Sequence, residues 1–297
     1  MAEGVFAQPD SSVQKALEER KWTPTPVQEV TQDDIASGND RLVVAPTGSG
    51  KTMAAMLPLL DRCLREKWEG MSILYITPLR ALNRDVDRRL DEITSAVGLR
   101  LGLRHGDTTQ SERNKHVRNP PNVMITTPET FQLMFTGSKL RELLRTVQAV
   151  VIDEVHEMAD GERGWQLSVG LSRLEAFKGS KVQRIGLSAT VGNPKQVAKW
   201  LSEDAEAINA IAPRTTELSV DAVVQMPEDE IGSLELAISP RAHATLRGLA
   251  DIVSKKHPCL IFVNSRNSAE TVSYTHLRAH ETLMNLVCRL LLEKMFV

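Results

Sequence analysis

The chain has 297 residues, with 36 basic and 38 acidic side chains and a formal net charge of −2. This balance provides no overall attraction to nucleic acid, so any nucleic-acid site must be a local arrangement of residues. The sequence lacks a run of about eighteen apolar residues and a charged start followed by an apolar core, so we expect neither a membrane-spanning helix nor a secretory signal. We therefore expect a cytoplasmic protein with no membrane partner. Its three cysteines lack metal-ligand spacing and are expected to be reduced structural thiols.

A glycine-rich loop at residues 45–52 follows a short β-branched run that predicts a buried strand, and it opens a helix. Gly48 and Gly50 allow sharp backbone turns, so successive N–H groups can bind phosphate oxygens beside the positive end of the helix. Lys51 would neutralise the β- and γ-phosphates, and the Thr52 hydroxyl would bind Mg²⁺. The predicted nucleotide-binding residues of the loop are Thr47, Gly48, Ser49, Gly50, Lys51 and Thr52. The alternative is an ordinary turn before an exposed helix.

Strand and helix signals alternate after this loop. Strands are predicted at residues 71–76, 99–103, 123–126, 147–152 and 182–187, and a helix is predicted at 78–96. Such alternation is typical of an α/β fold with a parallel sheet and helices on both faces. Ligands of such sheets bind at the carboxyl ends of the strands, where the chemically suggestive residues of this chain also fall.

Two adjacent acids follow the strand predicted at 147–152, about a hundred residues after the loop. The spacing suits a strand beside the first one. Asp153 would hold Mg²⁺, and Glu154 would orient and deprotonate an attacking water. His156 would sense the γ-phosphate. The alternative is a pair of acids that caps a helix.

A Ser-Ala-Thr tripeptide follows the strand predicted at 182–187. We expect the hydroxyls of Ser188 and Thr190 to bond to Asp153 or His156 and to change partners when the γ-phosphate leaves. With His156 they would couple the ATP state to the grip on nucleic acid. The tripeptide alone is not a specific signal. Its position after a strand and downstream of the two acids makes it one.

These motifs, in order, resemble the first lobe of superfamily-two DExH helicases, which implies a RecA-like fold, ATP and Mg²⁺ as cofactors, and ATP-dependent helicase activity. Several segments are also similar to the large helicase-related (Lhr) family. The segments that carry the resemblance are Gln28, 45–52, 75–83, 105–108, 118–121, 126–129, 153–156, 163–164, 188–190 and 261–266.

The resemblance implies that Gln28, with Phe6 or Trp22, clamps the adenine of ATP. It also implies that one strand of DNA or RNA is held through its phosphates, which positions the strand without reading its sequence. The residues implied in this grip are Pro78, Arg80, Thr127, Pro128 and Glu129. Arg84 and Arg88 either extend the basic strip or belong to a solvated charged face. The turn at His105 is assigned no contact.

We expect a first RecA-like lobe at residues 1–212, a connecting segment at 213–239, and the start of a second RecA-like lobe at 240–270. The resemblance implies that second-lobe arginines needed for efficient turnover would lie beyond Arg266, so this chain is expected to be the ATP-binding part of a longer protein. Two alternatives remain: a superkiller-type DExH RNA helicase, and an ATP-gated nucleic-acid clamp with little turnover.

The tail from about residue 271 resembles translated sequencing adapter. Residues 272–282 match a transposase adapter codon by codon, and residues 286–294 match a flow-cell sequence in the same frame. We therefore expect residues 271–297 to be an artefact without a role in the fold, and we discount His276, His280 and Cys288 as metal ligands. The alternative is a natural amphipathic C-terminal helix.

Overall fold

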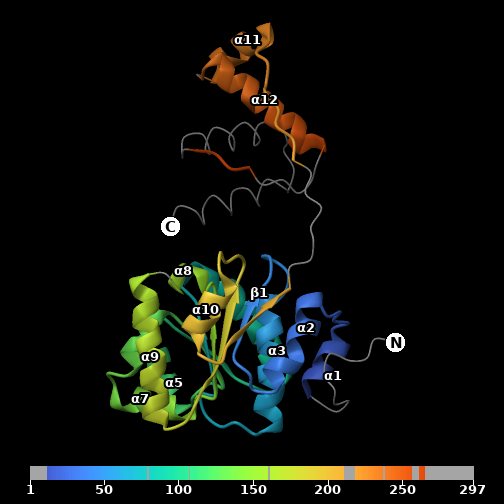
Figure 1. Ribbon diagram of the computed structural model, residues 1–297. Helices are drawn as coiled ribbons and strands as arrows, with labels where there is room; N and C mark the ends of the chain where they lie inside the picture. The colour runs from blue at the N-terminus through green and yellow to red at the C-terminus, as the bar shows by residue number, and fades with distance from the viewer. Residues whose placement is uncertain are drawn as a thin grey trace. The chain divides into compact units, whose positions relative to one another are not determined.

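The structure is a computed structural model that describes residues 12–78, 80–106, 108–159, 161–210, 218–236, 238–255 and 261–264, without the side chains of 80–86, 235 and 236. The chain divides into two compact units, Met1–Pro213 and Arg214–Val297. Each unit is described by itself (Figure 1). The predicted adapter-like tail and the predicted adenine contact Phe6 lie outside the described residues.

The first unit contains a seven-stranded sheet in the order β3-β4-β2-β5-β6-β1-β7, and every pair of neighbours is parallel. Its strands are β1 (Arg41–Val44), β2 (Ile73–Ile76), β3 (Leu101–Arg104), β4 (Val123–Thr126), β5 (Ala149–Ile152), β6 (Gln183–Ser188) and β7 (Glu206–Asn209). The predicted parallel α/β fold is confirmed. Strands β1 to β6 match predictions within two residues at each end, whereas β7 was not predicted.

The helices of this unit are α1 (Ser12–Glu19), α2 (Pro26–Ala36), α3 (Lys51–Arg65), α4 (Arg80–Ala96), α5 (Gln110–Arg118), α6 (Pro128–Met134), α7 (Ser138–Leu143), α8 (His156–Ala159), α9 (Glu162–Lys178) and α10 (Pro194–Leu201), with a short 3-10 turn at Leu144–Thr146. Three of them, α2, α6 and α10, begin with proline. Proline suits the first helical turn, because its fixed φ is already helical and its missing N–H has no partner there.

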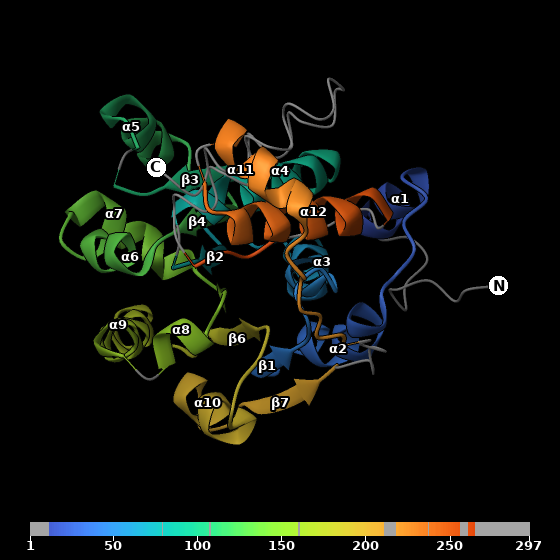
Figure 2. The same cartoon turned by 90° about the horizontal axis from the view of Figure 1, so that it is seen from above.

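The sheet separates two apolar cores. Helices α1 to α4 pack on one face, where Val43, Tyr75 and Val151 point. Helices α6, α8, α9 and α10 pack on the other face, where Val44 and Ile152 point. Figure 2 shows the sheet passing between these two layers. Because successive strand residues point to opposite faces and both faces are covered, every residue of β2, β4 and β5 is buried.

The strand order corrects one expectation about the site. The strand that precedes Asp153 was predicted to lie beside the strand that precedes the glycine-rich loop. In the structure β6 lies between them, paired with β5 on one side and with β1 on the other. The loops after β1, β6 and β5 are therefore consecutive along the carboxyl edge of the sheet, with the Ser-Ala-Thr loop in the middle.

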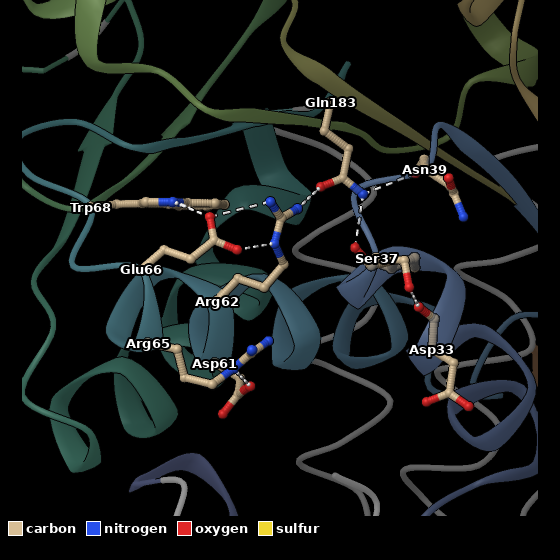
Figure 3. A network of polar contacts seen from close by, with 10 residues as sticks. Asp33, Ser37, Asn39, Asp61, Arg62, Arg65, Glu66, Trp68 and Gln183 are labelled. Carbon is tan, nitrogen blue, oxygen red and sulfur yellow. Dashed lines mark hydrogen bonds and ion pairs between the residues drawn. The ribbon is translucent and has the colours of Figure 1, made fainter. Parts of the chain in front are cut away.

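A polar network closes the opposite, amino edge (Figure 3). Gln183, the first residue of β6, accepts a hydrogen bond from Arg62 Nη1 at 2.8 Å and donates from Nε2 to the carbonyls of Ile35 and Asn39, both at 2.9 Å. Arg62 also donates from Nε to Glu66 Oε1 at 2.9 Å. One glutamine thus joins the end of α2, the C-terminal half of α3 and the start of β6.

The second unit contains two helices, α11 (Pro227–Leu236) and α12 (Pro240–Lys255), among its described residues. Asp229 of α11 is fully buried and accepts hydrogen bonds from His243 at 2.8 Å and from Arg247 Nη2 at 3.0 Å, both on α12. Helix α11 lies inside the stretch predicted as a connecting segment. The described residues 261–264 form no strand, because a strand requires a hydrogen-bonded neighbour and the described part of this unit provides none.

Candidate nucleotide and nucleic-acid site

The glycine-rich loop joins β1 to α3 as predicted. Gly48 and Gly50 have φ values of +78° and +95°, a left-handed conformation that side chains strain to adopt. A Cβ on Gly50 would also come within 2.6 Å of Gln28 Nε2. Glycine is therefore required at position 50 for both its conformation and the close approach of Gln28. Thr47 and Gly48 are exposed at the tip of the loop, where a phosphate can reach them.

Lys51 is only 8% exposed and folds back onto its own loop. Its Nζ donates to the carbonyl of Ala45 at 2.7 Å and to that of Pro46 at 3.2 Å. Burial lowers the pKa of Lys51, and the charges of Glu154 and Asp153 partly offset this effect. The ammonium group thus lies between the loop and the acidic pair, where a phosphate chain with its cation would have to bind.

Gln28 is buried at the start of α2 and contacts both the preceding turn and the glycine-rich loop. Its Oε1 accepts hydrogen bonds from Thr25 N at 3.1 Å and from Trp22 Nε1 at 3.2 Å, while its Nε2 donates to the carbonyl of Gly50 at 3.3 Å. The structure therefore brings Gln28 together with Trp22, one of the two aromatic residues that the sequence offered as its companion.

Asp153 follows β5 and is bonded on both carboxylate oxygens. Oδ2 accepts a hydrogen bond of 2.5 Å from the hydroxyl of Tyr75, and Oδ1 accepts one from Glu154 N at 3.0 Å. Tyr75 is fully buried in β2. Burial and then the charge of Asp153 raise the pKa of Tyr75 well above its usual value, and a hydrogen bond with the Thr52 side chain partly opposes this rise. Tyr75 thus contacts both residues predicted to bind Mg²⁺.

Glu154 adopts a strained backbone conformation with φ of +46°, although it is not glycine. Left-handed conformations are uncommon for such residues and concentrate at functional positions. Its Oε2 atom is buried without a hydrogen-bond partner and lies 3.4 Å from His156 Nδ1. Burial, followed by the charge of Asp153, raises the pKa of Glu154. The carboxylate is therefore held ready to accept a proton.

The Ser188 hydroxyl lies 2.9 Å from His156 Nδ1 and donates to the carbonyl of Thr190 at 3.2 Å. This contact joins the loop after β6 to the loop after β5. Thr190 contributes its carbonyl, and its side chain is exposed. The structure therefore brings His156 and Ser188 together, while no contact links the Thr190 hydroxyl to Asp153 or His156 among the described residues.

The donor set of the site fits Mg²⁺. Thr52 and Asp153 offer the hard hydroxyl and carboxylate oxygens that this ion prefers. The described residues contain no group of three or more His, Cys, Asp or Glu side chains placed to form a complete metal cage. This matches the usual binding of Mg²⁺ through one or two protein oxygens together with phosphates and waters.

The segments predicted to hold a nucleic-acid strand are joined by Arg163 of α9. Its Nη2 donates to the carbonyl of Pro78 at 3.3 Å, and its guanidinium is paired with Glu129 Oε1 at 2.8 Å. Thr127 caps α6 by accepting a hydrogen bond from Thr130 N, and Pro128 takes the first helical position. The side chain of Arg80 is outside the described part of the chain.

Two residues of the site had no predicted role. Tyr75 occupies a strand position at which an aromatic side chain usually indicates only a core residue, so its hydroxyl contact with Asp153 could not be predicted from the sequence. Arg163 was noted for its resemblance to the Lhr family. Its role in joining Pro78 to Glu129 depends on contacts across 85 and 34 positions of sequence, which no local pattern indicates.

Comparison with known proteins identifies the fold and the family. A family model described as DEAD/DEAH box helicase matches residues 25–197. The "Lhr helicase/ probable uracil glycosylase" of Mycolicibacterium smegmatis is 38% identical over 276 residues, covering 86% of this chain and 18% of its own length. The "ATP-dependent helicase Lhr-Core" of Methanothermobacter thermautotrophicus is 36% identical over 264 residues, covering 81% of this chain and 30% of its own.

A solved structure of the Mycobacterium smegmatis helicase Lhr, bound to ssDNA and AMP-PNP, superposes with a TM-score of 0.74 at 33% sequence identity, covering 93% of this chain and 37% of that one. The chain spans less than a third of the length of each of the two curated relatives named above. These findings confirm the resemblance drawn from the motifs, and the RecA-like fold with it. The chain belongs to the DEAD/DEAH box helicase family.

Proposed function

We propose that this chain is the ATP-binding part of an Lhr-type helicase or translocase, which couples ATP hydrolysis to movement on, or unwinding of, DNA or RNA. The observation that carries this proposal is the succession of three chemically complementary loops along one sheet edge. The phosphate-binding loop follows β1, the Ser-Ala-Thr loop follows β6, and the acidic pair follows β5. The backbone hydrogen bond from Ala45 N to the Ser188 carbonyl, at 3.1 Å, holds the first two loops together.

The chain's own residues divide the work of hydrolysis. The N–H groups of the glycine-rich loop bind the phosphates, and Lys51 exchanges its carbonyl partners for the β- and γ-phosphate oxygens. Gln28 and Trp22 lie beside the loop on the adenine side. Glu154 orients the attacking water and accepts its proton, a role that its raised pKa and unpaired oxygen favour. Mg²⁺, bound by Thr52 and Asp153, would neutralise charge that develops on the phosphate oxygens.

Coupling to nucleic acid would run through His156 and Ser188. His156 lies close to Glu154 and also contacts Ser188, so loss of the γ-phosphate can change both contacts at once. Arg163 fixes the segments of Pro78 and Glu129 relative to each other. Backbone N–H groups and hydroxyls there would hold the phosphates of one strand without reading its sequence. The single-stranded DNA in the solved Lhr structure supports this choice of ligand.

We propose that residues 1–212 form the first RecA-like lobe and that residues 240–270 begin a second one, which supplies arginines to the ATP site. None of the described helices is long and apolar enough to cross a membrane, and we propose a cytoplasmic location. Lys51, Asp153 and Glu154 together favour a motor over a clamp with little turnover.

Steady-state ATP hydrolysis tests the proposal. The protein assayed contains this chain and has the full length of its relatives. Rates are measured with and without single-stranded DNA or RNA oligonucleotides, and a strand-displacement assay follows on the same preparation. We expect the nucleic acid to stimulate hydrolysis. Equal rates with and without every oligonucleotide would reject a helicase or translocase, and binding without hydrolysis would favour the clamp.

A further inference from the structure

The carboxyl end of β3 holds a buried positive charge that the proposed function does not use. Arg104, the last residue of this strand, is 7% exposed, and its Nη1 atom is buried without a hydrogen-bond partner. An unpaired buried charge is costly, because the group has lost its water and gained nothing in return. Such groups are rare in native proteins and require an explanation, such as a ligand that completes them.

Arg104 lines a small pocket with an interior volume of about 50 Å³. Ligand pockets that enclose a whole small molecule usually occupy about 300–1,000 Å³, so this one suits a single charged group of a larger ligand. Its lining combines positive, hydroxyl and apolar side chains from β3 and from α5 to α7. These residues are Arg104, His105, Gly106, Arg113, Thr130, Leu133, Met134 and Leu140.

A second arginine is fixed at the mouth of the pocket. Arg113 donates from Nε to the carbonyl of Thr108 at 2.9 Å and from Nη2 to that of Gly106 at 2.8 Å. The turn itself is closed by a hydrogen bond of 2.8 Å from His105 N to Thr108 Oγ1. The two guanidinium groups are close enough that Arg113, after burial, lowers the pKa of Arg104. Two like charges therefore lie close together at this turn.

Two described acids on the neighbouring helices are already engaged elsewhere, while Asp87 of α4 lies close enough to His105 for their charges to interact. Glu112 completes the cap of α5 by accepting hydrogen bonds from the backbone and side chain of Thr109. Glu129 is paired with Arg163. Neither is among the residues that line the pocket. Among the described side chains, the pocket therefore offers donors and positive charge to a ligand, and it matches a phosphate or another compact anion.

The pocket lies next to the segment proposed to hold a nucleic-acid strand. In the register of β3 and β4, Arg104 pairs with Thr126, the residue before Thr127. Thr130, which lines the pocket, supplies the N–H that Thr127 caps. A strand held at Thr127 and Glu129 would therefore pass the mouth of the pocket.

We propose that this pocket, built by Arg104 and Arg113, binds a backbone phosphate of the nucleic-acid strand, adjacent to the contacts at Thr127 and Glu129. The inference rests on the proposed function. It also revises the sequence expectation for the turn at His105, because the arginines on either side of that turn provide the contact. The ligand explains why the protein keeps a buried arginine that its own fold leaves partly unsatisfied.

Binding of a fluorescein-labelled oligothymidylate to the 297-residue chain tests the proposal by anisotropy at several salt concentrations. Arg104→Met keeps an unbranched apolar stem and removes the charge. Arg118→Met is the matched control, because Arg118 is exposed on α5 and does not line the pocket. A charged hydrogen bond is worth about 1.5–3 kcal/mol, so we expect Arg104→Met to bind about ten- to a hundredfold more weakly and Arg118→Met to differ far less.

The salt dependence identifies the lost contact as a phosphate. For single strands, the slope of log affinity against log salt changes by about 0.7 for each phosphate contact. We expect Arg104→Met to reduce the slope by this amount. Equal weakening in Arg104→Met and Arg118→Met, or an unchanged slope and affinity in Arg104→Met, would overturn the proposal.

Thermal unfolding separates a binding role from a structural one. Removing an unpaired buried charge should leave the unfolding midpoint of Arg104→Met unchanged or raise it. A lower midpoint together with unchanged oligonucleotide affinity would show a structural arginine and overturn the proposal. Should Arg104→Met fail to fold, Arg104→Lys keeps the charge and loses the planar fork, and its expected affinity lies below that of the parent.

Inorganic phosphate tests the pocket independently of the helicase proposal. In a Lys51→Ala background, which weakens the competing site in the glycine-rich loop, phosphate should raise the unfolding midpoint, and Arg104→Met should abolish that rise. A phosphate effect without oligonucleotide binding would retain the pocket and reject a nucleic-acid strand as its ligand. No phosphate effect and no difference in oligonucleotide binding would reject the pocket itself.

Discussion

The group of residues around Gln183 at the amino edge of the sheet and the loops at its carboxyl edge differ in how completely their polar atoms are paired. At the amino edge, Gln183 uses both its oxygen and its nitrogen, and Arg62 bonds to Gln183 and Glu66. At the carboxyl edge, Ser49 Oγ, Glu154 Oε2 and Arg104 Nη1 are buried without partners. The backbone strain at Glu154 also lies at this edge.

These residues at the amino edge are therefore arranged for stability, and those at the carboxyl edge are arranged for binding. Paired groups at the amino edge hold α2, α3 and β6 together at no cost to function. Unpaired groups at the carboxyl edge cost stability and are retained where a ligand would satisfy them. Substitutions at the first edge should therefore change stability, and substitutions at the second should mainly change binding or chemistry.

The largest effect is expected for Glu154→Gln at the carboxyl edge. Loss of a general base lowers the rate by a factor of about 10²–10⁴. A protein that contains this variant and has the full length of its relatives should therefore lose nearly all nucleic-acid-stimulated hydrolysis. Nucleotide should still bind, since the amide keeps the shape of the side chain. Steady-state turnover and equilibrium nucleotide binding measure the two quantities. Glu157→Gln, at an exposed position of α8, is the control and should retain activity. A Glu154→Gln rate above about a tenth of the parent's would contradict the assigned role.

At the amino edge, Gln183→Leu should lower the free energy of unfolding by about 1–3 kcal/mol. The change leaves Arg62 Nη1 and the Asn39 carbonyl, both partly buried, without this partner, and it removes one of the hydrogen bonds to the buried Ile35 carbonyl. Urea denaturation measures the loss, with Gln196→Leu at an exposed position as the control. Nucleotide affinity of the folded variant should equal that of the parent. A large loss of affinity with little loss of stability would break the division between the edges.

Tyr75→Phe tests a contact that lies between the core and the site. Groups that orient a metal ligand typically contribute about 10–100-fold to metal affinity. Removing the hydroxyl that bonds to Asp153 should therefore raise the Mg²⁺ concentration needed for tight nucleotide binding about tenfold. Nucleotide affinity measured in EDTA should change little. An unchanged Mg²⁺ requirement would show that Tyr75 serves the core alone.

The smallest effect concerns pH. Burial raises the pKa of Asp153 and of Glu154, so the folded chain holds protons at a pH where the unfolded chain has released them. Their contribution to stability is fully present below the unfolded pKa values, near 4, and is lost as the pH rises through the folded ones. Glu154→Gln removes one of these groups. The free energy of unfolding of Glu154→Gln, relative to that of the parent, should therefore increase from about pH 4.5 toward neutrality. Urea denaturation at several pH values across this range measures it. A relative stability that decreases over this range would show that the carboxyls are stabilised as anions.

The sequence predicted most of the first unit because its strands are buried on both faces and therefore form continuous apolar runs. β7 was missed because Glu206–Asn209 is a sheet-edge strand with exposed residues at both ends, so its burial follows neither a continuous nor an alternating pattern. α11 was missed because its stabilising residue, Asp229, is a buried acid whose partners lie 14 and 18 positions further along the chain.

The sequence also predicted the loops that meet at the carboxyl edge, since glycine spacing and paired acids after strands are local signals. It did not predict which strand separates them, because pairing of β6 with both β1 and β5 depends on the order of all seven strands. The contacts of Tyr75 and Arg163 were likewise not predicted. Each joins segments that are distant in sequence, and each residue type is common in strands or helices without any such role.

The position of Lys51 bears on the thermodynamics of the proposed nucleotide site. Because its ammonium already bonds to the Ala45 and Pro46 carbonyls, an arriving phosphate would replace two existing contacts and would not meet a free cation. The same contacts already order the Lys51 side chain, so less entropy would be lost when a phosphate binds. The exchange would also lower the net enthalpy gained on binding. The two carbonyls would then compete with a departing phosphate for the ammonium, which would favour release of the product.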